Sequence, residues 1–169
     1  MSAPSPAEIA ALAARLGSSV AADRLTAAET LCRAGEAARP AAVSLVRGCD
    51  DVDSQVRDWC VAALEELGPP PETAVPDLTA LLASGPLAAY WAATLLGRAG
   101  QAAGSAAVAL GESLAAGIDP AVRQRAAWAL GKLGPTATAA RGPLAAAAND
   151  PDERLARLAA AALAALGDG

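Results

Sequence analysis

The sequence contains no histidine and no phenylalanine, and its aromatic residues are limited to three tryptophans and one tyrosine. Without histidine, the Ser-His-Asp and Cys-His arrangements of nucleophilic catalysis and histidine-ligated metal sites are excluded. No glycine-rich phosphate loop is followed by a lysine. We therefore expect a protein that is not an enzyme and that holds neither a metal nor another cofactor.

Cysteine is also scarce. It occurs at Cys32, Cys49 and Cys60, an odd number without C-x-x-C spacing. This usage indicates neither a disulfide framework nor a zinc site, and it fits reduced thiols. The N-terminal segment has no basic region before its apolar stretch, and no run of about 20 apolar residues lacks charge. We expect a cytoplasmic protein without a signal peptide or a membrane span.

Positive charge is in short supply as well. The 13 lysines and arginines are outnumbered by 18 aspartates and glutamates, which gives a formal net charge of −5. A nucleic-acid binder needs a basic stripe to displace counterions, so we do not expect this function. Hydrophobic residues, mostly alanine and leucine, make up 54% of the sequence. Because alanine has the highest helix propensity, the composition predicts an all-α protein.

The chain repeats a helical unit five times. Glycines follow apolar runs at positions 35, 68, 100, 134 and 167, which lie 32 to 34 residues apart. A small residue stands eight positions before each glycine, and a leucine stands four positions before it. These leucines are Leu31, Leu64, Leu96, Leu130 and Leu163. Since the two offsets lie on one helical face, each run is predicted to be a helix that packs through this face.

Each of these helices has start and stop signals. The closing glycine fits a left-handed residue after the last turn, and the expected N-cap residues are Asp53, Ser84, Asp119 and Asp152. A weaker helix is expected to precede each of them, over residues 6–16, 38–48, 72–83, 102–116 and 138–148. We predict one domain over residues 1–169, with repeats at 5–35, 38–68, 72–100, 102–134 and 138–167.

The runs "DPAVRQRAAWALGKLG" and "DVDSQVRDWCVAALEELG" resemble the short HEAT-like repeat of the phycobilisome-lyase type, whose pattern is D-x-x-V-R-x-x-A-x-x-A-L-x-x-L-G. The resemblance covers essentially the whole chain and is weakest in the first and third units. In the third unit, Ala89 replaces the arginine. It implies a right-handed α-solenoid whose second helices line the concave side. It implies no single function.

Arg57 and Arg123 occupy the arginine position of the repeat, and Arg24 stands at the same offset in the first unit. One interpretation is an anion-binding ladder along the groove. The other, which the resemblance implies, is a structural role in which the arginine bonds loop carbonyls or an aspartate of a neighbouring unit, here Asp51 or Asp150. We favour the structural role, because an acidic chain collects anions poorly.

A candidate binding site lies on the helix face that points away from the packed positions. At 100° per residue, four side chains are expected together on the concave side: Tyr90, Thr94, Gln124 and Trp128. Asp58 and Glu65 are expected to continue this face as an acidic stretch. Exposed tryptophan and tyrosine are typical binding anchors. The alternative is that Trp128 folds onto neighbouring alanines.

These patterns predict an interaction scaffold that binds a protein or peptide partner, for which the acidic stretch favours a basic one. The alternative, implied by the resemblance, is an accessory, chaperone-like role in attaching a bilin-type cofactor to a protein. A third hypothesis is self-association through the C-terminal helix. It rests on four alanines at positions where charge would be expected, Ala160, Ala161, Ala164 and Ala165.

Overall fold

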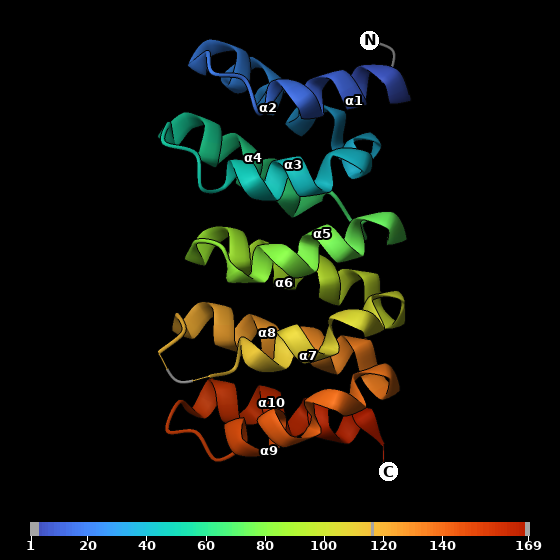
Figure 1. Ribbon diagram of the computed structural model, residues 1–169, viewed down its shortest axis with the longest axis vertical. Coiled ribbons are helices and arrows are strands. Elements are labelled where there is room, and N and C mark those ends of the chain that lie inside the picture. Colours follow the sequence, from blue (N-terminus) through green and yellow to red (C-terminus); the bar gives the residue numbers. More distant parts are fainter. Residues whose placement is uncertain (1–3, 116, 168–169) are drawn as a thin grey trace. The chain divides into compact units, whose positions relative to one another are not determined.

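The computed structural model describes residues 4–115 and 117–167, and in these ranges every regular element is a helix (Figure 1). The all-α prediction is therefore confirmed for the described part of the chain. The chain divides into two compact units, with the boundary between Ala74 and Val75. Whether the whole chain folds as one domain stays a prediction.

The first unit contains two helix pairs, in which α2 packs against both α1 and α4, and α3 packs against α4. Short 3-10 segments follow α2 and end the unit. The helices are α1 (Pro6–Arg15), α2 (Ala21–Ala34), α3 (Ala42–Gly48) and α4 (Ser54–Glu66), and the 3-10 segments are Gly35–Ala41 and Glu72–Ala74.

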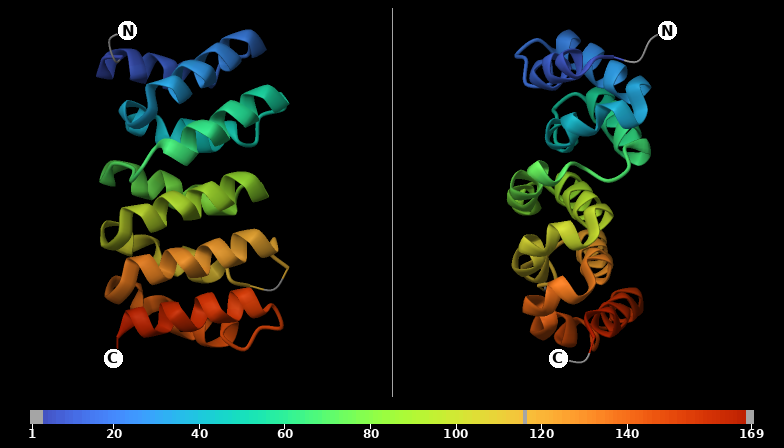
Figure 2. Two further views of the ribbon diagram at one scale, coloured as in Figure 1. Left: turned by 180° about the vertical axis from the view of Figure 1, so that it is seen from behind. Right: turned by 90° about the vertical axis from the view of Figure 1, so that its right-hand side faces the viewer.

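The second unit contains three helix pairs. Its second helices, α6, α8 and α10, pack side by side as one layer, and its first helices form the other layer (Figure 2). The helices are α5 (Val75–Ala80), α6 (Pro86–Ala99), α7 (Ala107–Glu112), α8 (Pro120–Leu133), α9 (Arg141–Ala147) and α10 (Glu153–Leu166). The 3-10 segments are Leu81–Ala83, Gly100–Ala106 and Gly134–Ala140.

The stop signals of the second helices are confirmed. The backbone φ angle is positive at all five closing glycines, between 55° and 77°, a conformation that glycine adopts without steric cost. The N-caps at Asp53, Asp119 and Asp152 are also confirmed, because each carboxylate accepts a hydrogen bond from the first turn of its helix. The prediction for Ser84 is wrong: Gly85 is the N-cap of α6, and Pro86 takes the first helical position.

The first helices are shorter than predicted. The segment expected over residues 102–116 is a 3-10 segment followed by α7, which ends at Glu112. The segments expected over 38–48 and 138–148 likewise begin as 3-10 turns. The physical reason is that the chain leaves the left-handed glycine in a tight 3-10 turn, which is common where two helices are joined.

The predicted core positions are buried, with one exception. The small residues eight positions before the glycines and the leucines of the first four repeats are fully buried. Leu163 of α10 is only half-buried. Within the described residues, α10 packs against α8, α9 and the 3-10 segment between them, and this leaves one flank of the helix uncovered.

Candidate functional site

An arginine of one repeat braces the loop of the next repeat at two places in the molecule. In the first unit, Arg24 on α2 holds Asp51 with two hydrogen bonds, from Nε at 2.7 Å and from Nη2 at 3.0 Å. The second oxygen of Asp51 also accepts from the Asp53 amide at 2.9 Å. The Arg24 guanidinium keeps the pKa of Asp51 below its ordinary value.

The second unit repeats this arrangement between α8 and the loop before α10. Arg123 donates to Asp150 at 2.5 Å and to the Leu114 carbonyl at 2.9 Å. Asp150 accepts from the Asp152 amide, as Asp51 does from Asp53. The hydrogen bond from Arg123 lowers the pKa of Asp150. Both aspartates thus stay ionised at neutral pH and tie two successive repeats together.

The remaining arginine position behaves differently. Arg57 donates to the carbonyl oxygens of Asp51 and Val52 in its own loop, at 2.7 and 3.2 Å. In the third repeat the arginine is replaced by Ala89, and Gly117 stands at the place that corresponds to Asp51 and Asp150. The arginine and its aspartate are therefore missing together. All these contacts are the bracing contacts of the structural interpretation.

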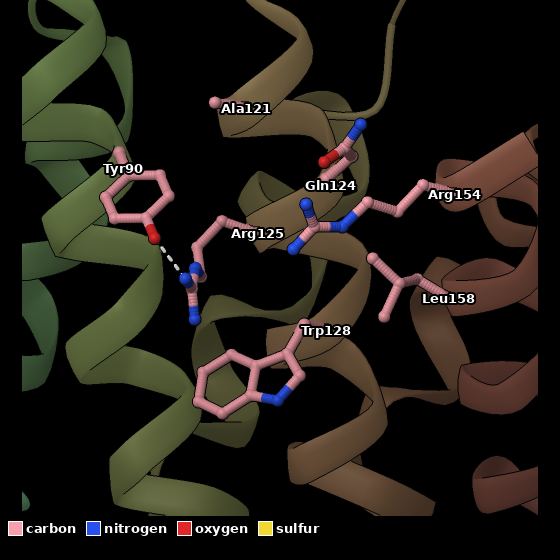
Figure 3. A pocket seen from close by; sticks show the side chains of 7 residues that line it. All are labelled: Tyr90, Ala121, Gln124, Arg125, Trp128, Arg154 and Leu158. Atoms are coloured by element: carbon pink, nitrogen blue, oxygen red, sulfur yellow. Dashed lines mark hydrogen bonds between the residues drawn. The ribbon is translucent and has the colours of Figure 1, made fainter. Parts of the chain in front are cut away.

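A second cluster lies on the layer of second helices in residues 75–169 (Figure 3). Arg125 of α8 reaches across to Tyr90 of α6 and donates a hydrogen bond to its hydroxyl. The Arg125 Cζ lies 4.5 Å from the Tyr90 ring centroid and 5.1 Å from the Trp128 ring centroid. Both distances are within the range of cation–π attraction. Two aromatic rings therefore hold this guanidinium in one place.

Trp128 is half-buried, and its indole lies over Gly97 in the last turn of α6. A Cβ on Gly97 would lie 2.4 Å from Cζ3 of the indole and 3.1 Å from the Ala129 Cα. Glycine is thus required at this position for α6 and α8 to approach with the tryptophan between them. Trp128 neither stands free in solvent nor simply folds onto alanines.

The predicted neighbours of Trp128 divide into two groups. Gln124 lies beside it and donates to Asp152 at 2.7 Å, which lowers the pKa of that carboxylate. Thr94 is only 4% exposed, and its hydroxyl donates to the Tyr90 carbonyl at 2.8 Å. The prediction for Thr94 is wrong, because α8 covers this face of α6.

The cluster borders an open pocket of about 210 Å³ that also receives Arg154 and Leu158 from α10 (Figure 3). The charged residues that line it are Arg125 and Arg154. The expected acidic character is therefore wrong for this pocket. Asp58 and Glu65 are exposed on α4 of the first unit.

Arg125, Arg154 and Leu158 were not predicted as site residues. The repeat pattern of the sequence could have indicated Arg125 and Leu158. Arg125 and Leu158 stand nine positions before their closing glycines, at the position that holds Trp59 and Trp91 in other repeats. A large side chain thus recurs at this position. At Arg125 this position reaches the neighbouring second helix, where its side chain contacts Tyr90 of α6.

The three cysteines belong to the first unit and do not line this pocket. Cys49 and Cys60 are buried and Cys32 is half-buried, and all three are free thiols. Burial raises the pKa of Cys60 to about 12, so its thiol stays protonated at neutral pH. In residues 4–115 and 117–167, no group of three or more histidine, cysteine, aspartate or glutamate side chains is placed to hold a metal ion.

The Ala-rich face of α10 is exposed. Ala160, Ala161, Ala164 and Ala165 all lie on the surface of the second unit. Self-association through this face stays a prediction. Among the described helices, none is long and apolar enough to cross a membrane.

Comparison with known proteins gives one family match, and it covers part of the chain. Residues 122–150, from Val122 in α8 to Asp150, match the family model described as PBS lyase HEAT-like repeat. No curated protein matches the sequence. The matched segment contains Arg123, Arg125 and Trp128, and so includes the bracing arginine and part of the pocket lining.

Several solved structures share the fold. An engineered protein is 22% identical, with a TM-score of 0.66, over 95% of this chain and 80% of its own. The complex of CpcE and CpcF of phycocyanin lyase from Nostoc sp. PCC7120 is 24% identical, with a TM-score of 0.64. That match covers 99% of this chain and 66% of the other, just under two thirds.

A designed armadillo repeat protein in complex with the peptide (KR)4 is 16% identical, with a TM-score of 0.61, over 95% of this chain and 82% of its own. Identities this low show the fold alone. Together with the helical repeats of both units, these matches confirm the predicted fold class, while its handedness stays a prediction. The chain has the fold of an all-α solenoid, and its residues 122–150 match the PBS lyase HEAT-like repeat.

Proposed function

We propose that this protein is an interaction scaffold and that a partner protein docks on the layer of second helices in residues 75–169. The observation that supports this most directly is the cluster of Tyr90, Arg125 and Trp128 beside an open pocket. Tyrosine, arginine and tryptophan are the residue types that dominate binding hot spots.

The cluster is also held in place before any partner arrives. Arg125 is fixed by the Tyr90 hydroxyl and by two aromatic rings, and Trp128 rests on Gly97. Side chains that are already ordered lose little conformational entropy on binding, so more of the contact energy is available as affinity.

The test is the affinity for a partner captured from the protein's own cells. We expect Trp128→Ala to weaken binding at least tenfold, the loss typical of a central aromatic anchor. The matched control is Trp59→Ala, since Trp59 is another half-buried tryptophan on a second helix but lies in the first unit. That variant should change the affinity less than twofold. Circular dichroism checks that both variants keep their helices.

Unchanged affinity in Trp128→Ala with intact helicity would count against this surface. Tyr90→Ala then serves as a second variant, because it deletes the ring on the other side of Arg125. The scaffold proposal for residues 75–169 fails if both variants bind as the unaltered protein does.

A second candidate function is an accessory role in bilin attachment, which rests on the family match and on the fold shared with the phycocyanin lyase complex. Trp128 lines the pocket, and Arg125 and Arg154 could pair with carboxylates. However, a pocket of about 210 Å³ is smaller than the roughly 300–1,000 Å³ of ordinary small-molecule sites. A shift in the absorption spectrum of biliverdin on mixing would support this role, and an unchanged spectrum would count against it.

A further inference from the structure

The pocket next to Trp128 is a local concentration of positive charge in a protein whose net charge is −5. Arg125 enters it from α8 and Arg154 from α10, and its other lining residues are uncharged. The two guanidinium groups therefore face the same small volume from neighbouring repeats (Figure 3).

Among the described residues, Arg125 is not paired with a carboxylate. Its hydrogen-bond partner is the neutral Tyr90 hydroxyl, and its other contacts are ring faces. Within the described ranges, neither Arg125 nor Arg154 forms an ion pair. Arg24 and Arg123, in contrast, are each paired with an aspartate. A guanidinium has five donors, so Arg125 has capacity left for an anionic ligand.

The carboxylate of Asp152, which is hydrogen-bonded to the pocket residue Gln124, already has its hydrogen-bond donors. Asp152 accepts from Gln124 and from the amides of Arg154 and Leu155, as the N-cap of α10. Its pKa is lowered mainly by the Gln124 hydrogen bond. Asp152 is thus held at the start of the helix and does not pair with the pocket arginines.

The remaining lining residues can pack against the methylene groups of a short ligand side chain. Trp128, Leu158 and Ala121 supply apolar surface beside the two arginines. The volume of about 210 Å³ fits one side chain better than a whole small molecule. Apolar surface beside two guanidinium groups matches a glutamate side chain, whose methylenes carry a carboxylate.

We infer that this pocket binds a carboxylate side chain within an acidic segment of the partner protein. The inference rests on the proposed function and gives the chemistry of its binding site. Charge complementarity supports an acidic segment, because bidentate arginine–carboxylate contacts fix both position and orientation. The designed armadillo repeat protein shares the fold and is in complex with the basic peptide (KR)4. The ligand inferred for this pocket has the opposite charge.

The experiment measures the anisotropy of fluorescein-labelled octaglutamate, with octalysine and an octathymidylate as comparison probes, at low and at physiological ionic strength. We expect octaglutamate to bind most tightly and its affinity to fall with added salt. Arg154→Ala should weaken octaglutamate binding about fivefold, near the upper end for an exposed charge pair.

The matched control is Arg157→Ala, which removes the same charge one turn further along α10 from a residue that does not line the pocket. That variant should change octaglutamate binding less than twofold. Equal weakening by the two variants would show diffuse attraction and overturn the inference. It is also overturned if octaglutamate does not bind at low salt, or if octalysine or octathymidylate binds more tightly.

The natural partner separates this inference from the proposed function. If Trp128→Ala abolishes its binding but Arg154→Glu leaves it unchanged, the docking surface stands and the carboxylate chemistry is wrong. If neither variant changes its binding, the docking surface itself is wrong. Loss of binding in both variants, but not in Arg157→Glu, is the result that we expect.

Discussion

Arg123 and Arg125 stand two residues apart on α8, and only Arg123 of the two is paired with a carboxylate. Arg123 is paired with Asp150 in the loop before α10, so its charge is balanced by a carboxylate of the same protein. Arg125 lies between the rings of Tyr90 and Trp128, which hold it without neutralising it. One helix thus braces its neighbours on one side and offers an ordered, charged surface on the other.

The largest effect is expected from Gly97→Ala, which disturbs the packing of Trp128 against α6. The added methyl group would overlap the Trp128 indole and crowd the α8 backbone at Ala129. We expect the free energy of unfolding to fall by about 2 kcal/mol, as is usual for overpacking. Urea denaturation followed by circular dichroism measures this change.

The control for that variant is Gly142→Ala on α9, where an added methyl group meets no atom within 4 Å. Here the higher helix propensity of alanine acts alone and should stabilise the protein by up to ~1 kcal/mol. Equal effects of the two substitutions would show that the contact between Gly97 and Trp128 is unimportant.

The next largest effect is expected from removing the ion pair between Arg123 and Asp150. Asp150→Ala leaves the Arg123 guanidinium without its carboxylate and removes the acceptor for the Asp152 amide. We expect the melting temperature to fall on the order of 5 °C, since a half-buried charge loses its partner. An unchanged melting temperature in differential scanning calorimetry would contradict the bracing role.

A smaller effect is expected from pH. The pKa of Asp150 is lowered in the folded protein, chiefly by the Arg123 hydrogen bond. The carboxylate therefore stabilises the fold at pH values above the ordinary aspartate pKa, and this contribution is lost as the pH falls through the lower, folded value. The difference in melting temperature between the unaltered protein and Asp150→Asn should be constant from pH 7 to about 5 and shrink below about pH 4. A difference that grows on acidification would mean that the sign of this linkage is wrong.

The smallest effect is expected from Tyr90→Phe. It removes the hydroxyl that accepts from Arg125 and keeps the ring below the guanidinium. We expect octaglutamate to bind two- to threefold more weakly and the melting temperature to stay within about 2 °C of the unaltered protein. A change as large as that of Arg154→Ala would show that the hydroxyl, rather than the rings, holds Arg125.

The local features of the second helices could be predicted from the sequence because each depends on a few neighbouring residues. The closing glycines, the caps at Asp53, Asp119 and Asp152, and the apolar helix faces are of this kind. Gly85 as the N-cap of α6 was missed, because serine at position 84 offered the stronger side-chain signal. The 3-10 turns were missed because they form only where two successive helices change direction.

The candidate site was predicted in part. Tyr90, Gln124 and Trp128 were placed together by helical periodicity, and all three line the pocket. Periodicity could not show that α8 buries Thr94, or that Arg125 turns toward α6. Both depend on how closely neighbouring helices approach, and Gly97 sets this approach.

The sequence by itself determined the repeat, the helix ends and the all-α class, because backbone preferences and side-chain periodicity act within one helix. Only the tertiary structure decided which arginines form an ion pair with an aspartate. Arg123 meets Asp150 across 27 residues and Arg125 meets Tyr90 across 35. Charge pairing depends on distances between side chains of different repeats, and only the packing of the helices sets these distances.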